Sequence, residues 1–117
     1  MMEAHDRRLR AALILMEQNV ENALSVSRLA GALGISRRQL ERLFFREVNS
    51  SPAVVYRRMR LERAKQLLMK SDAPLIEIAI DSGFENASHF AKVFKRAYGQ
   101  SPSAWRRSEF PAQTVER

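Results

Sequence analysis

One helical pattern occurs twice in this chain, and this repeat constrains the fold more than any other feature. In both copies an apolar residue and an alanine are followed, at the same spacing, by a glycine and a bulky apolar residue. The first copy has Leu29-Ala30, Gly34 and Ile35, and the second, 49 positions later, has Ile78-Ala79, Gly83 and Phe84. After one extra residue the matches resume at an offset of 50: Leu40, Leu43, Phe44, Arg46, Ser51 and Pro52 correspond to Phe90, Val93, Phe94, Arg96, Ser101 and Pro102. The repeat predicts two copies of one helical unit, joined by a long helix through Leu61 to Lys70.

Apolar residues recur at the helical spacing of three and four in every long segment, and no segment shows the alternation of a strand. Capping residues or Ser-Pro pairs precede most of these segments, which is typical of helix starts. The sequence therefore predicts an all-α fold of about seven helices. They are expected after Asp6, over 26–33 after Ser25, over 37–47 after Ser36, over 52–70, from 72–74 to Gly83, over 87–98 after Asn86, and from Ser101-Pro102 through Trp105.

These boundaries predict one double helix-turn-helix domain over residues 1–107. The first helix-turn-helix is expected at about 25–47, the linker helix at about 54–70 and the second helix-turn-helix at about 74–98. The tail over 108–117 has no periodicity and is expected to be flexible. A linker of about 17 residues spans about 25 Å.

The repeated residues suit a tight crossing of two helices. A small residue is needed where the helices meet, and Ala30 and Ala79 supply it. Gly34 and Gly83 allow a turn at positive φ, and the following Ile35 and Phe84 are expected to fold back as apolar plugs. This is the arrangement of a helix-turn-helix, in which the second helix enters the major groove of DNA. With two such units joined by the linker helix, one chain is predicted to cover two segments of the major groove and to bind an asymmetric site.

The charge of the chain points to a polyanionic partner. Lys and Arg number 20 against 13 Asp and Glu, which gives a net charge of +7 and an isoelectric point of about 10.8. A domain this basic usually binds nucleic acid or an acidic membrane surface. The alternative, a basic surface that is merely solvated, stays open on charge alone.

The composition argues against several other classes of protein. There is no cysteine, which excludes disulfides, thiolate metal sites and cysteine nucleophiles. The two histidines, His5 and His89, have no acidic partners at metal-ligand spacing, and Glu77 and Asp81 are interpreted as surface charges. We therefore expect no enzyme, no metal and no cofactor. No run approaches the ~18 apolar residues of a membrane span, so no membrane partner and a cytoplasmic location are expected.

Polar side chains are expected to form one exposed face on the second helix of each copy. With the apolar residues buried, Arg37, Arg38, Glu41 and Arg42 lie opposite them in the first copy, and Ala87, Ser88, His89 and Lys92 in the second. Arginine suits bidentate contact with guanine, and short side chains can approach a base or a thymine methyl group. Side chains expected to contact phosphates lie further along: Arg46, Lys95, Arg96, Ser101, Ser103 and Arg106.

Over about 24–107 the chain resembles the DNA-binding domain of the AraC/XylS family of bacterial transcription regulators. The second half carries the most specific residues of this resemblance: Ile78-Ala79, Gly83-Phe84, Ser88-His89-Phe90, Phe94-Lys95-Arg96, Gly99, Ser101-Pro102 and Trp105-Arg106. The first half adds Leu29-Ala30, Leu33-Gly34-Ile35-Ser36, Arg38, Leu40, Arg42-Leu43-Phe44 and Ser51-Pro52. The segments 37–42 and 61–64 are most similar to the subgroup whose sensor is an amidotransferase-like domain.

The resemblance implies base reading from Arg38 and Arg42, with Arg37 and Glu41 beside them, and from the four positions named above on the second copy. It also implies double-stranded DNA as the partner and an activator that contacts RNA polymerase. An effector sensor domain is absent from this chain, so we expect either an excised domain or a short member of the family. Asn49 stands where the second copy has Gly99, and asparagine tolerates the same left-handed conformation.

An interaction module is the main alternative to a DNA-binding protein. A basic helical domain could bind another protein without recognising DNA. We expect the two small cores to consume the apolar residues and to leave no helix with spare apolar area, which argues against this alternative. RNA binding is disfavoured because exposed aromatic side chains for base stacking are not expected.

Overall fold

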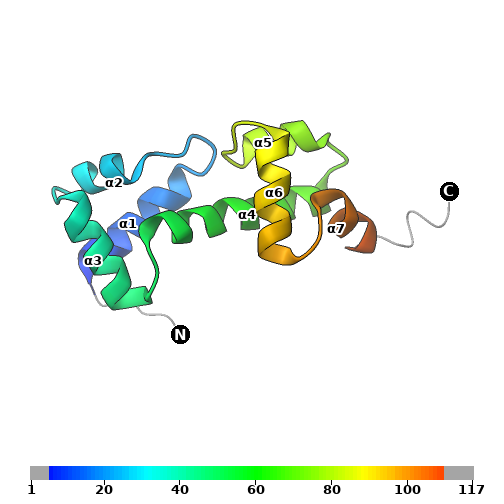
Figure 1. Cartoon of the computed structure of the whole chain (residues 1–117). Helices are drawn as coiled ribbons and strands as arrows, with labels where there is room; N and C mark the ends of the chain where they lie inside the picture. The colour runs from blue at the N-terminus through cyan, green and yellow to red at the C-terminus, as the bar shows by residue number, and fades with distance from the viewer. Residues whose placement is uncertain (1–5, 110–117) are drawn as a thin grey trace. The chain divides into compact units, whose positions relative to one another are not determined.

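Seven α-helices make up residues 6–109, the part of the chain that the computed structural model describes (Figure 1). No strand occurs in this range, so the predicted all-α fold is confirmed. The helices are α1 (Arg7–Gln18), α2 (Val26–Ala32), α3 (Arg37–Val48), α4 (Pro52–Lys70), α5 (Leu75–Asp81), α6 (Ala87–Tyr98) and α7 (Pro102–Glu109).

Side-chain caps begin most of these helices, as the sequence predicts. The side chains of Asp6, Ser25 and Asn86 accept hydrogen bonds from backbone N–H groups in the first turns of α1, α2 and α6. At α3 the capping is reciprocal, because Ser36 accepts from the Gln39 N–H at 3.0 Å and Gln39 accepts from the Ser36 N–H at 2.8 Å. Such caps satisfy donors that have no partner within the helix, and they fix where α3 and α6 start.

The start of α5 agrees with the predicted one, and the end of α7 does not. α5 begins at Leu75 after its N-cap Pro74, the last residue of the predicted start over 72–74, and no side chain caps it. α7 runs on to Glu109, although residues from 108 onward are predicted to be a flexible tail. The Ser108 hydroxyl donates to the Trp105 carbonyl and so continues the last turn. The remainder of the predicted tail lies outside the described residues.

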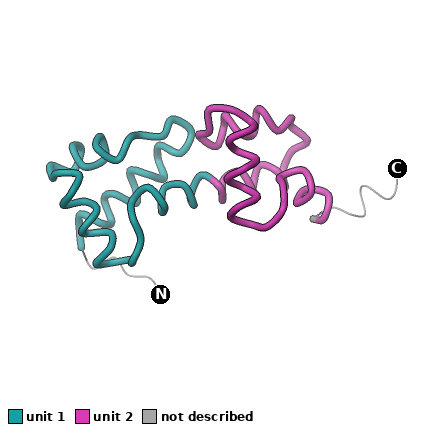
Figure 2. Tube along the Cα trace, viewed as in Figure 1, with its two compact units in different colours: residues 1–60 teal, residues 61–117 magenta. Residues whose placement is uncertain are grey.

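The chain divides into two compact units, and the division falls within α4, between Arg60 and Leu61 (Figure 2). The first part of α4 therefore packs in unit 1 and its last part packs in unit 2. Each unit contains one copy of the sequence repeat and one core of its own. The long helix predicted from the spacing of the copies is confirmed, and it begins at Pro52.

Unit 1 packs α1, α2, α3 and the start of α4 around one apolar core. Tyr56, which is 2% exposed, connects these helices through its hydroxyl group. That group donates to the Asn19 carbonyl and accepts from the Leu24 N–H, so it ties the loop between α1 and α2 to α4. The buried core residues are Leu9, Ala12, Met16, Leu29, Ala30, Leu40, Leu43, Phe44 and Tyr56.

Unit 2 packs the end of α4 with α5, α6 and α7 around an aromatic core. The Phe94 ring lies 5.6 Å from that of Phe90, 4.7 Å from Tyr98 and 6.2 Å from Trp105, all edge to face. Such pairs stabilise beyond their buried area. The buried core residues are Leu61, Ala64, Leu68, Ile78, Ala79, Phe84, Phe90, Phe94 and Trp105.

The turns of the two helix-turn-helix units have the same backbone geometry. Gly34 and Gly83 have φ of 72° and 87°, the left-handed region that glycine adopts without steric cost. The next residue donates its N–H back into the preceding helix in both copies, from Ile35 to Ala30 at 3.0 Å and from Phe84 to Ala79 at 2.9 Å. These are the bonds of a Schellman cap, so the repeat in the sequence is a repeat in structure.

The cores do not take up every large apolar side chain. Within the described part of the chain, five are about half exposed, which corrects the expectation that the two cores consume the apolar residues. They are Ile14, Phe45, Met69, Ile76 and Ile80, with exposed fractions of 47–55%.

Candidate nucleic-acid interface

The exposed face of α3 carries three of its four predicted base-reading residues. Leu40, Leu43 and Phe44 are buried on the opposite face of the helix. Because residues three and four apart share a helix face, Arg38 lies in line with Glu41 and Arg42 on the solvent side. Arg38 and Arg42 are exposed, and Glu41 is partly exposed. Burial of one face therefore places two guanidinium groups on the other.

Arg37 lies at the edge of this face and forms an ion pair with Glu41. Its Nε donates to a Glu41 carboxylate oxygen at 3.1 Å, and the two side chains are 59% and 41% exposed. An exposed pair at this spacing contributes only a few tenths of a kcal/mol. Either group can therefore exchange this partner for DNA at little cost.

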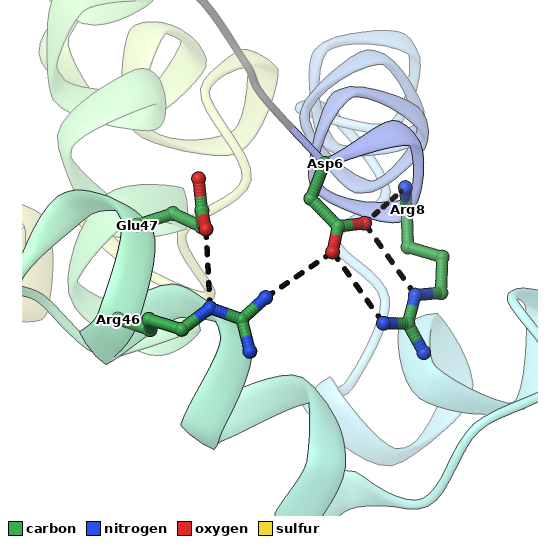
Figure 3. Close-up of polar contacts among 4 residues, drawn as sticks. All are labelled: Asp6, Arg8, Arg46 and Glu47. Carbon is green, nitrogen blue, oxygen red and sulfur yellow. Dashed lines mark hydrogen bonds and ion pairs between the residues drawn. The ribbon is translucent and has the colours of Figure 1, made fainter.

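Arg46 has two carboxylate partners that sequence reasoning missed (Figure 3). Its guanidinium group lies 3.2 Å from Asp6, at the start of α1, and 3.1 Å from Glu47. Asp6 also accepts hydrogen bonds from the side chain and from the backbone N–H of Arg8. Both bonds lower the pKa of the Asp6 carboxyl, and the side-chain bond contributes most. Arg46, predicted to contact a phosphate, is thus paired with negative charge at the junction of α1 and α3. Asp6 is 40 positions away in sequence, so no local pattern indicates this pair.

On α6 the same construction gives a less basic face. Phe90 and Phe94 are buried, so Ser88, Lys92 and Lys95 are exposed opposite them. The His89 ring lies 5.9 Å from that of Phe84, edge to face. Ala87 is half-buried, and Arg96 is exposed beside this face. Ser88 and Lys92 occupy the positions that Arg38 and Arg42 occupy in the first copy.

Contacts within unit 2 hold α6 against α4. The Tyr98 hydroxyl donates to the Glu62 carboxylate at 3.2 Å, and the Lys65 ammonium group lies 4.5 Å from the centre of the Tyr98 ring. Burial raises the pKa of Tyr98 to about 12, with a smaller contribution from the nearby Glu62 carboxylate. Tyr98 is therefore neutral at physiological pH and acts as a hydrogen-bond donor that holds α6 in place.

Arg106, predicted to contact a phosphate, is directed toward backbone carbonyls. Its Nε donates to Leu68 at 3.3 Å, and one Nη donates to Ser71 at 3.0 Å and Ala73 at 3.2 Å. These carbonyls lie at the end of α4 and in the segment that follows it, where no intrahelical donor is available. The geometry favours a structural role for Arg106 over the predicted phosphate contact.

Replacing Arg106 with alanine is expected to lower the free energy of unfolding of unit 2 by about 1–2 kcal/mol, because three carbonyls lose a charged donor. Lysine should restore little, since an ammonium group does not reproduce the planar set of donors. Urea denaturation followed by circular dichroism measures the effect, with the exposed neighbour Arg107→Ala as the control. Full stability of Arg106→Lys together with weakened DNA binding would instead support the phosphate contact.

The two serines predicted to lie near phosphates have different positions. Ser101 accepts from the Ala104 N–H at 3.1 Å and caps α7, as Ser51 caps α4 through the Val54 N–H. Ser103 is partly exposed in the first turn of α7. Several exposed arginines lie outside the predicted site: Arg10, Arg28, Arg57, Arg58 and Arg63. No sequence pattern distinguishes these arginines from basic residues that are simply solvated.

No helix within residues 6–109 has the length and apolar character needed to cross a bilayer. Two helical units, each with a Schellman turn and a capped second helix that exposes a polar face, define a double helix-turn-helix domain. A sequence profile described as a helix-turn-helix domain matches residues 29–108. The chain belongs to this family, in its AraC-type DNA-binding branch.

Known proteins similar to this chain are regulators of transcription. The chain is 37% identical over 95 residues to "HTH-type transcriptional regulator ArgR" of Pseudomonas aeruginosa, with 81% of this chain and 29% of that protein covered. The chain spans between 28% and 35% of the length of the curated relatives that it matches.

Solved structures agree with the fold. An AraC-type DNA-binding regulator from Chromobacterium violaceum superposes with a TM-score of 0.82 at 35% identity, covering 88% of this chain and 92% of that one. The DNA-binding domain of AdpA, solved in complex with a target DNA, has a TM-score of 0.83 at 28% identity, covering 91% and 98%.

Proposed function

We propose that this chain binds specific sequences of duplex DNA and regulates transcription, as a protein without catalytic activity. The observation that carries the proposal is that equivalent positions of the two copies, Arg38 and Arg42 on α3 and Ser88 and Lys92 on α6, are exposed on helices whose opposite faces are buried. The base-reading set is Arg37, Arg38, Glu41 and Arg42 on α3, with Ala87, Ser88, His89 and Lys92 on α6. The phosphate-contacting set is Arg46, Lys95, Arg96, Ser101 and Ser103. Similarity to a domain solved with its target DNA supports this assignment.

The two copies differ at their reading positions, and we infer that the two half-sites differ in sequence. Arg38 and Arg42 suit guanine, whereas Ser88 and Lys92 offer a short hydroxyl group and a single ammonium group. One chain with two unlike reading helices binds an asymmetric site in successive segments of the major groove. Footprinting combined with a measured stoichiometry tests this. Two chains on a symmetric site would contradict it.

Activation through contact with RNA polymerase belongs to the same proposal, as does action on the chromosome in the cytoplasm of a bacterial cell. We further propose an origin in the subgroup with an amidotransferase-like sensor domain. The amino-acid sequence of the segments 37–42 and 61–64 supports that subgroup.

Arg42→Ala is expected to weaken binding to the preferred site by about 1–3 kcal/mol and to relax base preference at one or two positions. Arg96→Ala, at a proposed phosphate position, should weaken binding to preferred and random duplexes alike. Both side chains are exposed, so the fold should be retained. Fluorescence anisotropy on a site selected from a random library measures the affinities. Arg10→Ala, an equal charge change on α1, serves as the control, and identical profiles for Arg42→Ala and Arg96→Ala would contradict the division into two sets.

A further inference from the structure

Among residues 6–109, Phe45 is the most exposed of the large apolar side chains, at 55%, and it lies on the reading face of α3. It follows Arg42 by three residues, Glu41 by four and Arg38 by seven, and this spacing places all four on one side of the helix. The buried residues Leu40, Leu43 and Phe44 point to the opposite side. The phenyl ring is therefore in the middle of the polar face and not at its border with the core.

The second copy of the repeat shows what this position otherwise holds. At the offset of 50 residues, Phe45 of α3 corresponds to Lys95 of α6, which is exposed on the equivalent face. A lysine there can pair with a phosphate, but a phenyl ring offers nothing to an anion. An exposed ring amid charged groups gains only when apolar surface covers it. A ligand of the α3 face that presents an apolar group beside its anionic groups would therefore gain from covering this ring.

We propose that Phe45 contacts the 5-methyl group of a thymine in the major groove and so specifies an A·T pair in the half-site bound by α3. The methyl group of thymine is the apolar feature that the major-groove edges present, and phenylalanine is among the side chains that contact it. Phe45 lies about 10 Å along the helix axis from Arg38. The inference rests on the proposed DNA-binding function, because α3 must enter the groove.

The test removes the methyl group from the DNA and the ring from the protein, separately and together. Wild type is titrated with its selected site and with duplexes in which each thymine of the half-site is replaced in turn by deoxyuridine. One replacement should weaken binding about threefold to fivefold, the change expected for one buried methyl group. Phe45→Ala should lose a similar factor on the thymine duplex and lose nothing more with deoxyuridine at that position.

Two further variants keep the test selective. Phe45→Lys, which reproduces the residue of the second copy, should bind random DNA more tightly while losing the thymine preference. Ile14→Ala removes a comparably exposed apolar side chain on α1, at 47%, and should leave both properties unchanged. Because Phe45 is exposed, its replacement should not unfold unit 1, which circular dichroism checks.

The outcomes separate this inference from the proposed function. If wild type binds no duplex at any salt concentration, both fail. If wild type binds its site but Phe45→Ala retains the same discrimination between thymine and deoxyuridine at every position, only the thymine contact is overturned. Unchanged DNA binding together with reduced transcription from a promoter reporter would show that Phe45 contacts a protein partner, and this would also overturn the inference.

Discussion

Raising the salt concentration from 50 to 200 mM is expected to weaken binding of this chain to duplex DNA by about 10³- to 10⁴-fold. The net charge of +7 and the exposed cations of α3 and α6 predict that about six to eight phosphates are neutralised on binding. Each neutralised phosphate releases a condensed counterion, so the logarithm of the affinity should fall with the logarithm of the salt concentration with a slope near −5 to −7. Anisotropy titrations with a labelled duplex over this range measure the slope.

The ion pairs of unit 1 bear on the size of this slope. Arg46 is shared between Asp6 and Glu47, so part of its charge is already compensated within the protein. Asp6→Asn should therefore leave Arg46 more available and make the slope slightly steeper. Circular dichroism at each salt concentration confirms that the chain stays folded. A response to salt that is flat would refute DNA binding by these basic faces.

Phe94→Ala is expected to destabilise unit 2 by about 3–5 kcal/mol and to leave unit 1 folded. The Phe94 side chain is fully buried, and its ring contacts those of Phe90, Tyr98 and Trp105. Its deletion leaves a cavity at the centre of the core of unit 2. Unit 1 has a separate core, so its hydrogen bonds should persist.

The repeat provides a matched control for this substitution. Phe44 occupies the equivalent position in unit 1 and is also fully buried. Phe44→Ala should therefore destabilise unit 1 instead of unit 2, exposing the amides of α1 to α3 to exchange while α6 stays protected. Hydrogen exchange resolved by residue measures both variants. Equal loss of protection in both units from either variant would show that the two cores fold as one cooperative unit.

Local sequence patterns were sufficient to predict the helices, the turns and the exposed faces. A capping side chain bonds to a backbone N–H within three residues, which is why the helix starts at Ser25, Ser36 and Asn86 could be identified directly. The left-handed turns at Gly34 and Gly83 follow from backbone sterics alone. The start of α5, which has no capping side chain, was predicted only as a range over 72–74, and the helix begins directly after Pro74.

The partners of the long charged and polar side chains were decided only by the tertiary structure. Arg46 and Arg106 look alike in sequence, as basic residues near the ends of helices. Packing of α1 beside α3 places Asp6 next to Arg46, while packing of α7 against α4 brings Arg106 to three carbonyls from positions 33 to 38 residues away. The sequence alone determined most of the buried helix faces, because burial largely follows from the period of apolar residues, but not that five large apolar side chains stay about half exposed. It could not determine the contacts of flexible side chains, because these depend on which distant segments the folded backbone brings within hydrogen-bonding distance.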